Sequence, residues 1–407
     1  MRILDLELTP VAFRDPPLLN STGLHEPLAL RCVLRLHVDG GVVGLGECPG
    51  DRGHLDRLAA VREHLIGHSV YALHHIERAV ERALAGVPDP IARRATFSAV
   101  EVACLDAQGR LAGVPVAELL GGAVRPAVPY AAYLFYKWAA HPGGPADEWG
   151  PATTPRELVE QAERMIGRYG FRSVKLKGGV LAPDEEIAAV QALSEALPGV
   201  PLRLDPNGAW TVGTARRVAE ELDGTLEYLE DPVLGLDGMA DVAAAAPMPL
   251  ASNMLTTSLE TLYPAARRGA VQVVLADHHY WGGLRATQRL ATVCAALGLE
   301  LSMHSNSHLG ISLAAMTHLA AAIPTPIHAC DTHYPWNAAD DVVVPGTLRF
   351  TGGAVPVPGG PGLGVELDHD ALARLHETYV RSGRQVRDDT GYLRRFQPDF
   401  DPTLPRW

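Results

Sequence analysis

Short apolar segments that end in a polar residue recur along the chain from Val128 onward. Alanine- and leucine-rich stretches with a helical pattern separate them. The residues at the segment ends are Lys175 and Lys177, Asp205, Glu230, Asn253, Asp277, His304 and Asp331. Counted from Lys177, successive ends are roughly 23 to 28 residues apart, about one strand and one helix each. This alternation predicts an α/β fold, a parallel barrel with outer helices, and eight strands result if Val128–Tyr133 is the first.

The region before the barrel, residues 1–125, has the pattern of a separate α+β domain. Apolar or alternating runs predict strands, Gly40-Gly41 predicts a hairpin, and helical patterns follow near 54–66, 71–85 and 96–112. The predicted strands are Arg2–Leu8, Ala29–Val38 and Val42–Glu47. PPLLNSTGLHEP (16–27) has the composition of a surface loop with turn-forming polar residues.

Composition restricts the class of protein and its partners. Hydrophobic residues make up 47% and charged residues 20% of the chain, which is typical of a soluble globular protein. No apolar run is long enough to cross a bilayer and the N-terminus lacks a signal-peptide core, so we expect a cytoplasmic protein without a membrane partner. The five scattered cysteines argue against a disulfide framework or a zinc site. The net charge of −12 and the absence of a basic stripe argue against nucleic acid.

Three consecutive segment ends have the chemistry of a metal site. Functional residues of a parallel barrel lie at the carboxyl ends of its strands, so Asp205, Glu230 and Asn253 should share one arc of the rim. Two carboxylates and an amide oxygen are hard ligands that suit Mg²⁺. Asp231 would point away or act from behind the ligands, and it is the alternative ligand.

The remaining ends supply candidate bases. Lys175 and Lys177 are two apart on a strand, point to the same side, and should lower each other's pKa, although such a pair alone is more often solvated. Across the barrel, Asp277 can fix the tautomer of His304. A metal that binds a carboxylate, with a base on each face of the α-carbon, allows racemisation or loss of a β-hydroxyl group.

Several motifs resemble the enolase superfamily, and within the mandelate racemase group its glucarate dehydratase-like branch. The general motifs are KLK (175–177), DPNGAW (205–210), EDP (230–232), SNM (252–254), the pair Asp277 and His304, and the helix segment 101–122. The more specific ones are LLNSTGLHEP (18–27), YLFY (133–136), the segment 303–322, DTHYPW (331–336), PGLGVELD (361–368) and VRDD (386–389). The resemblance covers essentially the whole chain.

The resemblance implies a modified (β/α)7β TIM-type barrel in residues 126–350, an α+β capping domain in 1–125, and a C-terminal segment, 351–407, that returns to the cap. It implies Mg²⁺ held by Asp205, Glu230 and Asn253. It also implies two sets of site residues. The catalytic set is Lys177 as one base with Lys175 as its electrostatic partner, His304 as second base and general acid oriented by Asp277, and Asn207 near the reacting carbon. The substrate-binding set is Asn20, Thr22, His25, Tyr133, Ser305, His333 and Arg387.

The expected function is that of an Mg²⁺-dependent acid-sugar dehydratase, a carbon–oxygen lyase that converts D-glucarate or a related aldarate to a 4-deoxy-5-keto diacid. The expected partner is this small acid-sugar substrate, and we expect a homo-oligomer. The alternatives are a racemase or epimerase of a 2-hydroxy acid with the same residues, a dehydratase of a different aldonic or aldaric acid, and a protein that only binds an acid sugar. Two departures from the family pattern bear on the substrate: Thr22 replaces the usual Ser, and the tail LRRFQPDFDPTLPRW (393–407) is particular to this chain.

Overall fold

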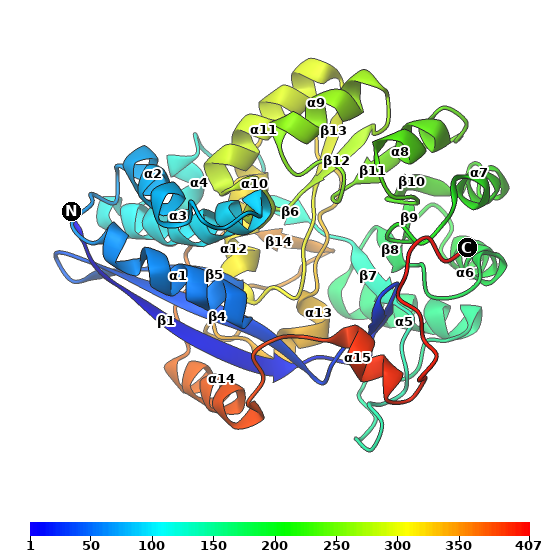
Figure 1. Cartoon of the computed structure of the whole chain (residues 1–407), viewed down its shortest axis with the longest axis horizontal. Coiled ribbons are helices and arrows are strands. Elements are labelled where there is room, and N and C mark those ends of the chain that lie inside the picture. The colour runs from blue at the N-terminus through cyan, green and yellow to red at the C-terminus, as the bar shows by residue number, and fades with distance from the viewer.

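The computed structural model describes residues 1–407, and a closed parallel barrel forms its larger part (Figure 1). Seven parallel strands are hydrogen bonded to their neighbours in the order β13-β12-β11-β10-β9-β8-β7. The strands are β7 (Ala132–Phe135), β8 (Val174–Lys177), β9 (Leu202–Asp205), β10 (Leu226–Glu230), β11 (Leu250–Ser252), β12 (Val273–Ala276) and β13 (Glu300–Met303). The predicted parallel barrel is therefore confirmed, and each strand from β8 to β13 ends at or beside the predicted polar residue.

Helices follow the barrel strands, and the longer ones form the outer layer of the barrel. The helices are α5 (Pro155–Tyr169), α6 (Pro183–Ala196), α7 (Val212–Glu221), α8 (Leu236–Ala243), α9 (Leu259–Arg267), α10 (His278–Trp281), α11 (Leu284–Leu297), α12 (Gly310–Ala322), α13 (Tyr334–Asn337) and η1 (Ala338–Asp340). Local sequence fixes the start of α5, where Thr154 and Glu157 form a reciprocal capping box that satisfies free N–H groups of the first turn.

The segment that ends at Asp331, predicted as the eighth strand, closes the barrel through a few backbone hydrogen bonds. It does not form a continuous strand. Asp331 donates its backbone N–H to the carbonyl oxygen of Met303 in β13 (2.9 Å). Cys330 donates to the carbonyl oxygen of Pro129 (2.8 Å) and accepts from the N–H of Ala131 (2.9 Å), just before β7. The segment between α12 and α13 therefore lies between the two edge strands.

The predicted bounds of the first barrel strand, Val128–Tyr133, are wrong. The barrel strand begins at Ala132, and β6 (Ala127–Pro129) pairs instead with β14 (Ala354–Pro356) in a separate antiparallel sheet. The physical reason is Pro129, which has no N–H to donate to a neighbouring strand and so interrupts a central strand.

The N-terminal region forms an antiparallel sheet covered by helices, as predicted. The sheet has the order β1 (Ile3–Arg14), β4 (Leu28–Val38), β5 (Val42–Pro49), and the helices are α1 (Arg52–Leu65), α2 (Leu73–Ala83), α3 (Pro90–Ala112) and α4 (Val116–Leu119). Glycine lets α3 pack directly on β5, because a Cβ atom at Gly44 would lie 2.0 Å from the carbonyl oxygen of Ala103. The third helix begins earlier than predicted, at Pro90, where Asp89 caps it.

The C-terminal segment returns to the cap and then to the barrel mouth (Figure 1, red). Helix α14 (His369–Ser382) packs on β1, and α15 (Asp389–Arg394) packs beside the cap hairpin formed by β2 (Leu19–Asn20) and β3 (Gly23–Leu24). The Arg406 guanidinium donates to the carbonyl oxygen of Ser21 in this hairpin (2.7 Å), and the Arg406 N–H donates to that of Ala209 after β9 (2.7 Å). The tail therefore links the hairpin to the barrel.

None of the helices combines the length and apolar character that crossing a bilayer requires.

Candidate active site

One cavity between the cap and the carboxyl ends of the barrel strands brings the predicted site residues together. All seven predicted substrate contacts line it, and so do Lys177, Asn207, Asn253 and His304. Lys175, Asp205, Glu230 and Asp277 are fully buried in the barrel next to these residues. Residues spread over most of the sequence therefore share one site.

Lys175 is buried among carboxylates. Its Nζ lies 2.6 Å from Glu230 Oε2, 2.7 Å from Asp331 Oδ2 and 3.3 Å from Asp205 Oδ2. Burial opposes the charged form, but the nearby carboxylates of Asp331 and Glu230 outweigh it, so the pKa of Lys175 is raised well above its ordinary value. The prediction that the paired lysines lower each other's pKa is therefore wrong for Lys175, which is held as a cation.

Lys177 lies at the cavity surface and is oriented by two oxygen atoms. Its Nζ donates to Asp205 Oδ2 (2.7 Å) and to Asn207 Oδ1 (2.7 Å). Asn207 has a left-handed backbone (φ 56°), stabilised by its N–H, which donates to Asp205 Oδ1 (3.1 Å). The Asn207 side chain also donates to Ser21 Oγ of the cap hairpin (3.2 Å), so the lysine, the first predicted ligand and the cap are connected.

The rarity of lysine in this chain also points to Lys175 and Lys177, and the spacing of the motifs does not show it. The chain has only three lysines, Lys137, Lys175 and Lys177, among 35 lysine and arginine residues. All three are buried. Arginine keeps its proton in a protein whereas a lysine amine can lose it, so lysine is the residue type that a base at this position requires.

The predicted Mg²⁺ ligands form a compact set of oxygen atoms at the ends of β9, β10 and β11. Burial and the neighbouring Asp205 raise the pKa of Glu230 well above its ordinary value. In the side-chain orientation that satisfies its hydrogen bonds, the Asn253 amide nitrogen donates to Glu230 Oε1 (3.3 Å) and to Asp231 Oδ2 (3.0 Å), so its oxygen would face a bound ion only after the amide rotates. A divalent cation would offset the repulsion between the two carboxylates, and carboxylate and amide oxygens are the donors that Mg²⁺ prefers, so the residues fit the ion.

Asp231, the alternative ligand, has hydrogen-bond partners on both carboxylate oxygens. Oδ1 accepts from the Ser252 hydroxyl group, and Oδ2 accepts from the N–H groups of Asn253 (3.0 Å) and Met254 (3.2 Å). Burial raises its pKa to about 6. Asp231 therefore holds the loop that carries Asn253, in agreement with a position behind the ligands.

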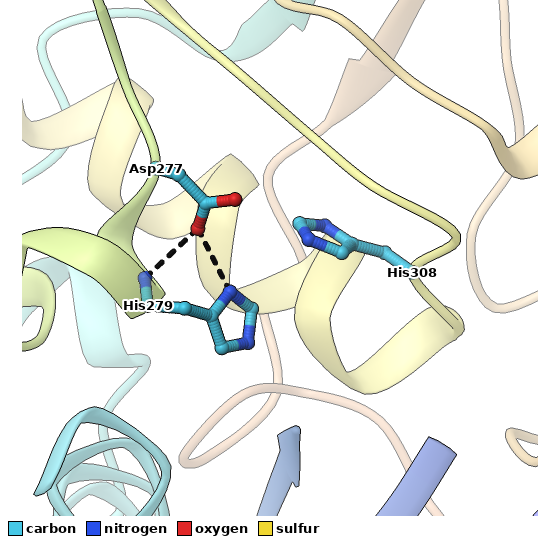
Figure 2. A group of neighbouring side chains, drawn as sticks. All are labelled: Asp277, His279 and His308. Carbon is cyan, nitrogen blue, oxygen red and sulfur yellow. Dashed lines mark hydrogen bonds and ion pairs between the residues drawn. The ribbon is translucent and has the colours of Figure 1, made fainter. Parts of the chain in front are cut away.

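The second candidate base lies at the end of β13. His304 Nδ1 is 3.3 Å from Asp277 Oδ2, so the carboxylate can orient the ring as predicted. Asp277 Oδ1 accepts from both the N–H and the Nδ1 of His279 (2.9 Å each; Figure 2). Although Asp277 is buried, its contacts with His279 and His304 lower its pKa well below the ordinary value. His279 was missed from the sequence, where it is one of two consecutive histidines on a short helix.

Figure 2 also includes His308, whose ring lies close to this pair. Single ligand atoms of Asp277, His279 and His308 lie within 4.8 Å of one another, as in a metal site. The oxygen that Asp277 would contribute on this side already accepts the hydrogen bond from His279. Neither ring nitrogen of His308 has a hydrogen-bond partner, so only Asp277 and His279 form a hydrogen-bonded support for the candidate base.

The segment 16–27 is not the plain surface loop that its composition predicted. It contains the cap hairpin β2–β3, which covers the cavity, and Asn20 Oδ1 accepts from both the N–H and the hydroxyl group of Thr22 (2.8 Å each). His25 is buried, with Nδ1 3.2 Å from Asp15 Oδ2. Contacts with the barrel and the C-terminal segment order these residues, and local composition does not encode them.

Arg387 lines the cavity, but carboxylates of the chain already pair with it. Its Nη1 lies 3.0 Å from Asp15 Oδ2, and its Nε donates to Asp389 Oδ1 (2.7 Å). Asp15, which the sequence analysis did not include, thus joins Arg387 to His25. The charge that Arg387 offers to a distal carboxylate is reduced accordingly, and its predicted role stays a prediction.

The other substrate-contact candidates line the barrel side of the cavity. Tyr133 contacts the lysine and carboxylate cluster: its hydroxyl group is 3.4 Å from Asp205 Oδ2 and its ring centroid is 4.6 Å from Lys175 Nζ. Ser305 Oγ lies 3.4 Å from His333 Nδ1. Burial, together with the nearby His25, lowers the pKa of His333 well below its ordinary value, so the ring is neutral.

Comparison with known proteins agrees with this architecture. The family model "Enolase C-terminal domain-like" matches residues 157–371, and the model "Mandelate racemase / muconate lactonizing enzyme, N-terminal domain" matches 11–121. A probable glucarate dehydratase of Streptomyces coelicolor is 50% identical over 430 residues, covering 100% of this chain and 99% of that protein.

Solved structures are similar over the whole chain, and two examples carry bound ligands. An enolase from Thermobispora bispora complexed with magnesium and formate has a TM-score of 0.98 at 58% identity, covering 100% of both chains. An enolase from Mycobacterium smegmatis complexed with tartrate has a TM-score of 0.98 at 57% identity, covering 100% of this chain and 98% of that one. The chain therefore belongs to the mandelate racemase and muconate lactonizing enzyme family, with an enolase-like C-terminal barrel domain.

Proposed function

We propose that the protein is an Mg²⁺-dependent acid-sugar dehydratase that acts on D-glucarate or a related aldarate. The observation that carries the proposal is one cavity lined both by Lys177, held by Asp205 and Asn207, and by His304, held by Asp277. The whole-length similarity to a probable glucarate dehydratase supports the reaction class, and the magnesium in the structure of a relative supports the cofactor.

Asp205, Glu230 and Asn253 are the proposed Mg²⁺ ligands. When bound, Mg²⁺ would stabilise the negative charge that develops on a substrate carboxylate as the neighbouring α-proton leaves. The Lys175 ammonium group, held as a cation by three carboxylates, adds fixed positive charge beside that position. These residues would make the α-proton acidic enough for a side-chain base.

His304 is the proposed base and acid for the elimination. With its Nδ1–H toward Asp277, the neutral ring has a free Nε2 that can remove the α-proton, and the electrons of the C–H bond form an enediolate. The resulting imidazolium returns that proton to the β-hydroxyl group as the C–O bond breaks, so water leaves. The enol product then tautomerises to the 4-deoxy-5-keto diacid.

Lys177 is the proposed base for the opposite face of the same carbon. In its neutral form it would abstract the α-proton of the substrate epimer, and Asn207 Oδ1 orients its nitrogen. A site with a base on each face interconverts epimers in the steps that precede elimination. The cap hairpin and Arg387 would contact the distal hydroxyl and carboxylate groups.

A substrate panel tests the proposal directly. The protein, supplied with Mg²⁺, is incubated with aldaric and aldonic acids of different stereochemistry, and keto products are measured. We expect a keto diacid from D-glucarate or a stereoisomer of it. Exchange of the α-proton with solvent deuterium but no keto product would indicate an epimerase, and the absence of both reactions for every acid would refute the proposal.

A further inference from the structure

We propose that His279 is a positioning residue that fixes the Asp277 carboxylate and thereby the ring of His304. This inference rests on the proposed function, in which His304 is a base. His279 does not line the cavity and is only 3% exposed. It therefore acts through its neighbour and has no contact with the substrate.

His279 makes two hydrogen bonds to the same carboxylate oxygen of Asp277. Asp277 caps α10, so its Oδ1 accepts from the His279 N–H (2.9 Å), and the same oxygen lies 2.9 Å from His279 Nδ1 (Figure 2). A buried carboxylate with a lowered pKa has no proton to share, so Nδ1 must carry the hydrogen. The second oxygen, Oδ2, is left for His304.

The other side of the His279 ring is fixed by the cap. With its hydrogen on Nδ1, the ring can accept at Nε2 from the Ser312 hydroxyl group (3.5 Å). The carbonyl oxygen of Glu47 at the end of β5, 3.2 Å from Nε2, is a packing contact, because two acceptors do not form a hydrogen bond. Glu47 is itself rigidly held, because its carboxylate pairs with Arg31 (2.7 Å) and accepts from the N–H groups at the start of α12, including that of Ser312 (2.8 Å). The ring therefore connects the cap to the carboxylate behind the candidate base.

The consequence is a chain of contacts in the order cap carbonyl, His279, Asp277, His304. With Oδ1 held, the carboxylate cannot rotate, and Oδ2 keeps the Nδ1–H tautomer of His304, which leaves Nε2 as the basic atom. If the Nδ1 contact is lost, only the backbone N–H of His279 restrains Oδ1. Removing one hydrogen bond to a charged group corresponds to a loss on the order of 10- to 100-fold in rate when the group acts in the transition state.

Two substitutions test the contacts of the two ring nitrogens of His279 separately. His279→Asn puts an amide nitrogen near the position of Nδ1 and can keep the contact with Asp277. His279→Gln puts one near the position of Nε2 and can keep only the contact with the Glu47 carbonyl oxygen. We expect kcat of the asparagine variant within about 5-fold of the unmodified protein, and kcat of the glutamine variant lower on the order of 10- to 100-fold with little change in KM.

Solvent-deuterium exchange distinguishes a specific effect on the position of His304 from a general loss of structure. In the glutamine variant, exchange at the α-carbon should fall for the epimer handled by His304 and persist for the epimer handled by Lys177. Equal loss of both would mean that His279 only supports the fold. Higher activity in the glutamine than in the asparagine variant would assign the role to the cap contact, and unchanged activity in both would show that the ring positions nothing; each of these results overturns the proposal.

A measurement on the unmodified protein keeps the inference testable if neither variant folds. Nitrogen-15 NMR of the histidine rings, with Mg²⁺ present, reports which nitrogen of His279 carries hydrogen. We expect a protonated Nδ1, and an unprotonated Nδ1 would overturn the inference. If no acid sugar is turned over at all, the proposed function fails, while the NMR result still decides whether His279 holds Asp277.

Discussion

Replacing Lys175 with methionine should destabilise the protein strongly, and Mg²⁺ should reverse part of the loss. Methionine retains most of the side-chain volume but removes the ammonium group that contacts three carboxylates at 2.6, 2.7 and 3.3 Å. Because the lysine side chain and its partners are buried, removing the charge leaves uncompensated carboxylates inside the barrel. Such losses are about 3–5 kcal/mol, and we expect this range for Lys175→Met without metal.

The metal dependence follows from the shared ligands. Asp205 and Glu230 are partners of Lys175 and also the proposed Mg²⁺ ligands, so removing the lysine makes the site more negative and should strengthen metal binding. A ten-fold increase in affinity adds about 1.4 kcal/mol of stability at saturating Mg²⁺. The loss in Lys175→Met should therefore be about 1 kcal/mol or more smaller with Mg²⁺ than with EDTA.

Urea unfolding with Mg²⁺ or with EDTA measures both quantities, and Lys137→Met is the matched control. Lys137 is also fully buried and pairs with one carboxylate, Asp147 (2.7 Å), outside the proposed metal site. Its variant should lose the same free energy of unfolding in both solutions. A loss below about 1 kcal/mol for Lys175→Met, or a loss that Mg²⁺ does not reduce, would refute the reasoning.

Three further results are expected. Asp205→Asn should lose activity and most of the stabilisation by Mg²⁺. The unmodified protein, after treatment with EDTA, should regain activity when Mg²⁺ is added. If Mg²⁺ still raised the melting temperature of the variant as much as that of the unmodified protein, the ligand assignment would be contradicted. Arg406→Ala should raise KM about ten-fold with a smaller change in kcat, because the cap hairpin loses its link to the barrel, and Arg406→Lys should recover part of the loss in steady-state kinetics. Burial raises the pKa of Glu101 from 4.5 to about 7. The stability that depends on its neutral carboxyl group is therefore fully present below pH 4.5 and is lost as pH rises through 7. The total loss is about 3 kcal/mol. In urea unfolding, Glu101→Gln should therefore gain stability relative to the unmodified protein between pH 5 and pH 8, and an unchanged difference would contradict the assigned cause.

The barrel could be predicted from the sequence because its signal is periodic. Each buried strand ends in a polar residue at one rim, so the spacing of Asp205, Glu230 and Asn253 predicts both the strands and their shared edge. The first strand was predicted with wrong bounds because apolar character runs through Pro129 into a different sheet. The eighth segment could be recognised only from its end at Asp331, since its backbone pairing is irregular.

The electrostatic state of the site could not be predicted from local spacing. Lys175 and Lys177 are two residues apart on β8, but the environment of Lys175 is set by Glu230 and Asp331 from other parts of the barrel, which raise its pKa. Arg387 likewise matches a motif, yet its partner Asp15 comes from the opposite end of the chain. His279 carried no separate signal, because its role depends on contacts with both the cap and Asp277.

The central claim, that Lys177 and His304 act on opposite faces of one carbon, is tested most directly by stereospecific exchange. Each α-epimer of the substrate is incubated in deuterium oxide with Mg²⁺ and with the unmodified protein, Lys177→Met or His304→Asn, and deuterium at the α-carbon is measured by NMR. We predict that the unmodified protein exchanges both epimers, that Lys177→Met loses exchange of one epimer, and that His304→Asn loses exchange of the other. Retention of both exchanges in either variant, or loss of the same epimer's exchange in both, would contradict the two-base site.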